Sequence, residues 1–441
     1  MRERLFKQID NAPLVVFRIF FGFLLACETF GAILTGWVKN NFITPKFTFS
    51  FIGMDWLQPL PGYGMYFYFI AMGILGLMVM AGYKYRYSIA LFTVLWSGVY
   101  FMQKTSYNNH YYLLVLVCLI MCFLPAHRYA SIDAKQNPQI KSAGMPAWCS
   151  WVMIAQVTIV YIFATLAKFY PAWLDGTFTR NLLGTSVSIP WLHDIMTQKW
   201  FYLFIAYAGI AFDGLIVPLM LYKRTRTIAF IASLIFHIFN SITLQIGIFP
   251  FFALTFAVFF YPPGTIRKIF LKKKPAFVSE GTSYEGKNIL LHFFIPYLII
   301  QVVLPLRHYF IKGDVLWTEE GHRLSWRMML RNRNGRTKFV VIDKDTKQVL
   351  NYSLSDNLTS KQRSAMNTRP DMIWQMAQRI KLDFANQGKD VEVHANSNVA
   401  VNADPYKIFI DPNVDLAAVP WDYFAHCDWI LLYDDNNIPI K

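Results

Sequence analysis

The sequence has few charged residues: 16% of its 441 residues are Asp, Glu, Lys or Arg, whereas 55% are hydrophobic. About a quarter of an ordinary soluble protein is charged, so this composition argues against that class. Acidic residues are especially scarce, with 27 Asp and Glu against 42 Lys and Arg, which gives a net charge of +15. Basic loops of a membrane protein explain this excess better than a nucleic-acid partner, which we do not expect.

Cysteine is also rare, and its spacing excludes two common uses. The five cysteines are Cys27, Cys118, Cys122, Cys149 and Cys427. They form no Cys-x-x-Cys pair and no zinc-ligand pattern, so we interpret them as core thiols and expect no metal site. A cleavable signal peptide is not expected, because residues 1–11 are polar and basic and the next apolar run is long enough to span a bilayer.

Long apolar runs dominate the first two thirds of the chain. We expect about nine membrane-spanning helices. They are placed near residues 13–37, 63–83, 87–102, 110–124, 147–168, 200–222, 227–247, 248–261 and 289–306. The connections on the side of Met1 hold about 17 Lys and Arg, and those on the other side hold about five. This asymmetry predicts a cytoplasmic N-terminus, and an odd number of spans places the C-terminal part outside.

The composition changes after Arg307. Short strands are predicted at residues 339–342, 391–393, 408–410 and 430–432. A hairpin turn is predicted at residues 332–335 and a helix at residues 370–386. The predicted fold is a multi-pass α-helical membrane domain, residues 1–306, followed by an extracytoplasmic, mostly-β domain, residues 307–441.

Lys168 stands at the end of the fifth apolar run, where a charge is costly unless it reaches water or has a function. Lys, Tyr and Trp commonly anchor a helix at that depth, and the neighbouring aromatic residues fit this reading. A partly desolvated lysine also loses its proton more easily and can act as a base. The run alone leaves both interpretations open.

Lys168 and two other polar residues, His110 and Asn240, belong to the outer half of the membrane on this topology. His110 opens the fourth span after Asn109, and Asn240 lies in the seventh span with His237 one turn before it. Side chains of this kind usually face a bundle interior or a cavity. Each has a simpler explanation: Asn109 as a helix cap, Asn240 as an interhelical hydrogen bond, and His237 as a satisfied core histidine.

Two acidic residues within spans have no assigned partner. Asp213 fits either an ion pair with Arg18 or a proton relay, and Glu28 fits a partner for Lys168.

Several widely spaced segments match one known family in the same order. They are residues 107–112, 156–161, 164–168, 172–176, 237–241 and 246–249, with residues 317–318, 325–329 and 411–415 in the tail. On these segments the chain resembles the vitamin K-dependent γ-glutamyl carboxylases, whose membrane part is called the horizontally transferred transmembrane (HTTM) domain.

The resemblance implies an enzyme, a carboxylase of the carbon–carbon lyase class that also epoxidises vitamin K. Reduced vitamin K, as phylloquinol or menaquinol, would be deprotonated by Lys168 and oxygenated by O₂. The strong base so formed would remove a γ-proton from glutamate, and CO₂ would add to the carbanion. The resemblance assigns His110 to the glutamate or CO₂ step, and no metal is needed.

The same resemblance implies the binding residues and partners. Asn109, Asn240 and His237 would contact the quinone, and Trp317 and Trp326 the substrate. The expected partners are a lipid quinone, membrane lipids and a glutamate-containing peptide or protein. Two alternatives remain: a quinone epoxidase without protein carboxylation, and a non-catalytic protein that binds a lipid or quinone.

The chain also differs from the animal enzymes of this family. They carry two adjacent lysines, and the first position is Ala167 here. No disulfide is plausible for the lone Cys427 of the tail. These differences lead us to expect a bacterial-type member in the inner cell membrane, with its C-terminal domain in the periplasm.

Overall fold

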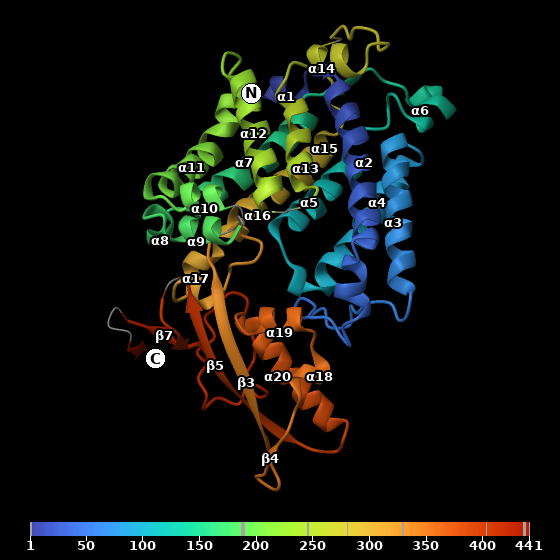
Figure 1. Cartoon of the computed structure of the whole chain (residues 1–441). Coiled ribbons are helices and arrows are strands. Elements are labelled where there is room, and N and C mark those ends of the chain that lie inside the picture. Colours follow the sequence, from blue (N-terminus) through green and yellow to red (C-terminus); the bar gives the residue numbers. More distant parts are fainter. Residues whose placement is uncertain are drawn as a thin grey trace.

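The computed structural model describes residues 2–186, 190–244, 247–279, 281–328, 330–402, 404–434 and 438–440. Met1, Ile246, Met329 and Lys441, which belong to the predicted domains and motifs, lie outside the described residues. Figure 1 shows a bundle of helices formed by the N-terminal two thirds and, at one end of it, a smaller part built from a sheet and helices. The N-terminus lies at the opposite end of the bundle.

The bundle is built from long helices joined by short ones. The long helices are α2 (Ala12–Leu34), α3 (Gly64–Ala81), α4 (Tyr85–Met102), α5 (Asn109–Phe123), α7 (Trp148–Leu166), α11 (Lys199–Leu221), α12 (Arg226–Leu244) and α16 (Ile295–Leu306). The shorter ones are α1 (Arg2–Phe6), α6 (Ile132–Gln136), α8 (Pro171–Leu174), α9 (Thr177–Ser186), α10 (Pro190–Met196), α13 (Phe249–Thr255), α14 (Pro263–Phe270) and α15 (Lys287–Ile289). Strands β1 (Gln8–Asp10) and β2 (Gly144–Pro146) pair at the N-terminal end.

Five helical segments among the described residues are long and apolar enough to cross a membrane. They are α2, α3, α7, α11 and the segment Lys287–Phe310 that contains α16. Three shorter apolar helices, Asn109–Phe123, Arg226–Ile242 and Phe249–Phe259, stand where further spans were predicted. The remaining predicted span, residues 87–102, is helix α4. The chain is therefore a helical membrane protein, while the count of nine spans stays a prediction.

Small residues bring the first two long helices into close contact. A Cβ atom added to Gly76 of α3 would lie 2.8 Å from the backbone nitrogen of Ala26 in α2, and one added to Gly22 would clash with Met80. Membrane helices associate through such packing, because lipid tails offer no hydrophobic driving force between helices. Glycine at these two positions therefore sets the α2–α3 distance.

The C-terminal part combines a sheet with helices. Its strands are β3 (Arg333–Asp343), β4 (Val349–Leu350), β5 (Val391–Val401), β6 (Lys407–Ile408), β7 (Leu432–Tyr433) and β8 (Pro439–Ile440). Its helices are α17 (Val315–Thr318), α18 (Leu354–Asn357), α19 (Ser360–Met366) and α20 (Pro370–Ala385). The sheet is antiparallel with order β4-β3-β5-β6. Helices occupy as much of this part as strands do, so the mostly-β prediction is correct only in part.

The predicted helix at residues 370–386 is confirmed as α20, and its apolar face is buried in the core through Met372, Met376 and Ile380. The predicted hairpin turn at residues 332–335 is wrong. Residues 333–335 lie in β3 and pair with residues 399–401 of β5. Gly335 is needed for a different reason: a Cβ atom there would clash with the carbonyl oxygen of Asn367. The glycine marks a close approach of two backbones, not a turn.

The two parts share a tight interface. Phe49, from the connection between α2 and α3, is buried in the core of the C-terminal part beside Met376. Lys104, in the turn between α4 and α5, lies 2.6 Å from the carboxylate of Asp371 at the start of α20. The C-terminal part is therefore fixed on the bundle by both apolar and ionic contacts.

Candidate active site

A cavity of about 230 Å³ lies among α5, α7, α9, α11, α12 and α13. Most of its walls are apolar, as with Val157, Phe236 and Phe256. The polar side chains in the lining belong to His110, Tyr161, Lys168, Thr179, Asp213, His237 and Asn240. The fold thus brings together four of the predicted site residues: His110 from α5, Lys168 from the end of α7, and His237 and Asn240 from α12.

Lys168 lies just beyond the last residue of α7, Leu166, and not within the helix as predicted. The chain must leave the helix here, because Pro171 disfavours helical geometry at the residue before it and that residue is extended. The Lys168 side chain turns inward: the residue is 8% exposed, and Nζ donates to the carbonyl oxygen of Ala164 at 3.0 Å. A snorkelling anchor would reach toward water instead.

The carboxylate partner of Lys168 is Asp213 of α11. The distance from Lys168 Nζ to Asp213 Oδ2 is 2.5 Å, and both side chains are buried. The pairing of Asp213 with Arg18 that the sequence left open is wrong, because the Arg18 guanidinium donates to backbone carbonyls, including that of Ala126. Glu28 is hydrogen-bonded to Tyr111 and does not pair with Lys168.

Two histidines also line the cavity. The His110 ring stacks on Phe249 with 3.6 Å between ring centres. His237 Nε2 lies 3.4 Å from the hydroxyl oxygen of Tyr161. His237 Nδ1 is buried without a hydrogen-bond partner among the described residues. An unpaired buried polar atom is costly, and the His237 side chain lines the cavity, so a ligand bound there could interact with this imidazole.

These features fit the head group of a lipid quinone. Such a group has a flat apolar ring with oxygens at its edge, and the cavity offers apolar walls with the side chains of His237 and Asn240 between them. Burial also excludes water, and a strong base can persist only where water is excluded. The arrangement can therefore bind an aromatic ring and move a proton at Lys168.

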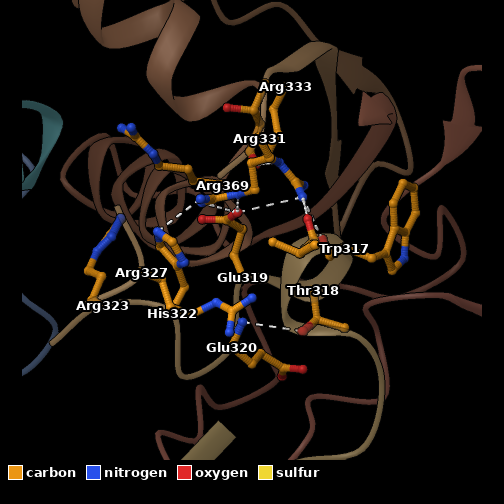
Figure 2. A network of polar contacts seen from close by, with 12 residues as sticks. Trp317, Thr318, Glu319, Glu320, His322, Arg323, Arg327, Arg331, Arg333 and Arg369 are labelled. Carbon is orange, nitrogen blue, oxygen red and sulfur yellow. Dashed lines mark hydrogen bonds and ion pairs between the residues drawn. The ribbon is translucent and has the colours of Figure 1, made fainter. Parts of the chain in front are cut away.

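A cluster of arginines lies in the C-terminal part, close to its junction with the bundle (Figure 2). Its members are Arg323, Arg327, Arg331, Arg333 and Arg369. Glu319 lies between two of them: Arg331 Nε donates to Glu319 Oε1 at 2.5 Å, and Arg333 Nη1 is 3.6 Å from that oxygen. Burial alone would raise the pKa of Glu319, but these arginines outweigh it and hold the pKa below its usual range.

Positive charge exceeds negative charge in this cluster. Asp371 pairs with Arg323, whereas Arg327 and Arg369 form no ion pair with a carboxylate in the described part of the chain. His322 is kept neutral, because burial and the neighbouring arginines hold its pKa well below the usual range. Its Nε2 accepts a hydrogen bond from Arg331 at 2.9 Å. The cluster is therefore an environment that favours an added anion.

The segment that carries these arginines is strained and touches the cavity. Glu319, Leu324 and Trp326 have positive φ angles of 63°, 61° and 58°, which non-glycine residues rarely adopt. Met328 of the same segment lines the cavity. The carbonyl oxygen of Leu330 accepts a hydrogen bond from Tyr170, which follows Lys168 closely. Strain of this kind is typical of functional segments.

Comparisons with known proteins give two family matches. The HTTM domain model matches residues 6–264, more than half of the chain. The model of the lumenal domain of vitamin K-dependent γ-carboxylase matches residues 286–436. The chain belongs to the vitamin K-dependent γ-carboxylase family. No solved structure matches the chain.

The family assignment supports the expected cofactor, the expected partners and the location of the C-terminal part. It implies reduced vitamin K as the cofactor, with glutamate-containing substrates and membrane lipids as partners. A lumenal-type domain indicates that the C-terminal part lies outside the cytoplasm. Among the described residues no group of three or more His, Cys, Asp or Glu side chains is arranged to hold a metal ion.

Three predicted site residues lie outside the cavity. Asn109 accepts a hydrogen bond from the Tyr107 hydroxyl at 3.0 Å and donates to the carbonyl oxygen of Arg327 at 3.1 Å. Trp326 is fully buried and stacks on Tyr112 with 4.8 Å between ring centres. Trp317 lies in α17, where its indole donates to the carbonyl oxygen of Leu431 at 2.7 Å. Asn109 and Trp326 connect the two parts of the protein, whereas Trp317 packs within the C-terminal part.

The partner of Lys168 and the arginine cluster are two features of the site that the sequence did not predict. Asp213 was visible as an acid inside an apolar run, and such residues are usually functional. The cluster could not be recognised from spacing, because Arg369 joins it from the position just before α20, far along the chain from Arg331.

Proposed function

We propose that this protein is a membrane enzyme that oxygenates reduced vitamin K and couples the reaction to γ-carboxylation of glutamate. The observation that carries the proposal is the buried Lys168–Asp213 pair in the wall of an apolar cavity that two histidines also line. Reduced vitamin K, when bound, would be oxidised by O₂, and this reaction would provide the free energy and the base for carboxylation. The residues of the chain bind it, exclude water and accept its proton.

In this proposal Asp213 prepares Lys168 for its role as a base. A lysine accepts a proton only when it is neutral, and the 2.5 Å contact allows the proton on Nζ to move to Asp213 Oδ2. This transfer converts an ion pair into two neutral groups, so the net charge of the low-dielectric cavity does not change. Nζ is then free to take a proton from a bound hydroquinone.

His237 and Asn240 would hold the ring oxygens of the quinone, and His110 would face the glutamate or CO₂ side. Asn109 has both ends of its amide engaged by protein groups, so we now assign it a positioning role. Its hydrogen bond to the backbone of Arg327 connects the start of α5, and with it His110, to the arginine segment.

The arginine cluster supports an acidic substrate. A glutamate side chain carries a negative charge that would balance the arginines without a carboxylate partner in the described part of the chain. Guanidinium groups bind carboxylates in a two-point geometry. The cluster lies on the segment that contributes Met328 to the cavity. A carboxylate held there would therefore stay close to the cavity. Trp317 and Trp326 support this segment and would act on substrate binding only indirectly.

An assay of the purified protein tests the proposal. The protein receives reduced vitamin K, O₂, labelled CO₂ and a glutamate peptide, with the matching glutamine peptide as the control. We expect quinone epoxide and label in the glutamate peptide only. Epoxide without label would identify a quinone epoxidase, and absence of both products would leave a lipid- or quinone-binding protein.

Replacement of the cavity residues should separate the two half-reactions. We expect Asn240→Ala to lower quinone epoxidation about tenfold, because it removes one hydrogen bond to the ring. His110→Ala should lower CO₂ incorporation about 10²-fold while epoxidation falls less. Both rates are measured on the same preparations. Equal losses of both activities in both variants would mean that these roles are assigned wrongly.

The orientation in the membrane can be tested by reporter fusions. We propose a bacterial inner-membrane protein of about nine spans, with residues 1–306 as the membrane domain, a cytoplasmic N-terminus and residues 307–441 in the periplasm. A reporter that is active only in the periplasm should be active when fused after Lys441. A reporter that is active only in the cytoplasm should be silent there, and its activity would overturn the topology.

A further inference from the structure

Two cavities share a wall at the end of the bundle that lies opposite the C-terminal part, where Figure 1 shows α14. One, of about 490 Å³, is lined by Tyr129, Ala130 and residues 269–274. The other, of about 970 Å³, is an apolar groove between α2, α12, α13 and α14. Ile269 and Phe270 line both, so the smaller cavity opens next to the groove.

The smaller cavity has a basic rim whose shape is held by a third lysine. Lys274 is buried, and its Nζ donates to the carboxylate of Asp10 and to the carbonyl oxygen of Ala143 at 2.9 Å. This contact fixes the turn after α14. Lys272 and Lys273 in the same turn are exposed, and they form no ion pair with a carboxylate in the part of the chain that the structure describes.

A further cation lies beside the same cavity. Lys141 Nζ is 5.8 Å from the ring centre of Tyr129, which lines the cavity. Lys272 and Lys273 thus line the cavity, and Lys141 lies near the Tyr129 ring that forms part of its wall. A phosphate group would find compensating charge there from several directions.

The groove has the length and character of a lipid-chain site. Phe20, Phe23, Ile231 and Phe251 line it, and each is between 39% and 54% exposed. Measured along α2 from Ala12 at 1.5 Å per residue, Phe20 lies about 12 Å into the bundle. One leaflet contributes about 15 Å of hydrocarbon, so the groove lies at the depth of an acyl chain.

We infer that the two cavities form one binding site for an anionic phospholipid of the leaflet opposite the C-terminal part. The phosphate lies against Lys272 and Lys273, and an acyl chain occupies the groove between α2 and α13. A free phosphate ion would use only the basic rim, and a zwitterionic lipid would bring its own cation to it. Only a negatively charged amphiphile matches both halves. The site does not depend on the proposed reaction.

Titration of the detergent-purified full chain, followed by native mass spectrometry, tests the inference. The probes are dioleoylphosphatidylglycerol, dioleoylphosphatidylcholine and inorganic phosphate. We expect the anionic lipid to bind about tenfold more tightly than the zwitterionic one, because each nearby lysine adds to the attraction of an anionic head group. The double variant Lys272→Glu with Lys273→Glu should lose this preference.

Two matched variants complete the experiment. Lys223→Glu with Arg224→Glu makes the same change of charge in the exposed turn between α11 and α12, outside both cavities, and should bind as the unmodified protein does. Thr227→Trp fills the groove and should weaken lipid binding with the lysines intact. Displacement of the lipid by inorganic phosphate, or equal binding of both lipids, would overturn the inference.

Discussion

Replacing Lys168 with arginine should abolish quinone epoxidation, with a loss of about 10²- to 10⁴-fold, the range for removal of a general base. A guanidinium group stays protonated at any pH the protein tolerates, so it cannot accept a proton from a hydroquinone. The charge itself is retained, and Asp213 keeps a cationic partner. The measurement is the rate of epoxide formation by purified variant protein at saturating reduced vitamin K.

Two further variants separate chemistry from folding. Lys168→Ala should be as inactive as Lys168→Arg, although it leaves the Asp213 carboxylate buried without its partner. Lys199→Arg changes an exposed lysine at the start of α11 and should retain activity, because the side chain lies in no cavity wall. Near-normal epoxidation by a folded Lys168→Arg protein would show that the lysine is an interfacial anchor, and the catalytic assignment would fail.

The positions of the helices could be predicted because they depend on local composition. Residues 13–37, 63–83 and 200–222 were expected as spans, and the structure has helices at Ala12–Leu34, Gly64–Ala81 and Lys199–Leu221. A run of apolar residues long enough to cross a bilayer has few other folded states, since a buried backbone must satisfy its own hydrogen bonds.

The partners of the polar residues could not be predicted in the same way. Lys168 and Asp213 are separated by 45 positions, and the short helices α8 to α10 between them decide which face of α11 meets the end of α7. The periodicity of each helix says which residues share a face, but not which other helix that face meets. The sequence therefore could not exclude Glu28 as a partner of Lys168, or Arg18 as a partner of Asp213.

Turn signals failed for a related reason. The Asn-Gly pair at Asn334 and Gly335 is a strong hairpin signal, yet both residues lie within β3. The small size of Gly335 is used against the backbone of Asn367, a contact between residues that are distant in sequence. A local pattern cannot distinguish a turn glycine from one required by tertiary packing.

The second large effect is expected at the junction of the two parts of the protein. Asp371→Ala should lower the free energy of unfolding by about 3–5 kcal/mol, because it leaves buried cations without their carboxylate. Lys104 is 1% exposed and lies 2.6 Å from Asp371, and Arg323 lies 3.2 Å from the same oxygen. Thermal unfolding of the purified protein should show a markedly lower midpoint, with earlier proteolysis between the bundle and the C-terminal part.

The effect should also depend on pH with a definite sign. Burial opposes ionisation of Asp371, but Arg323 and Lys104 outweigh it and hold its pKa below the usual range. A lowered carboxylate pKa contributes stability that is present above the unfolded value of about 3.9 and is lost as the pH falls through the folded value. The difference in stability between the unmodified protein and Asp371→Ala should therefore be full at neutral pH and shrink in acid.

A surface ion pair provides the control for this experiment. Asp390 lies 3.0 Å from Lys344, and both side chains are substantially exposed, so Asp390→Ala should cost at most about 1 kcal/mol. If Asp371→Ala were no more destabilising than Asp390→Ala, the Lys104–Asp371–Arg323 group would not hold the C-terminal part on the bundle. The attachment would then rest on apolar contacts such as that of Phe49, and Phe49→Ala would have the larger effect.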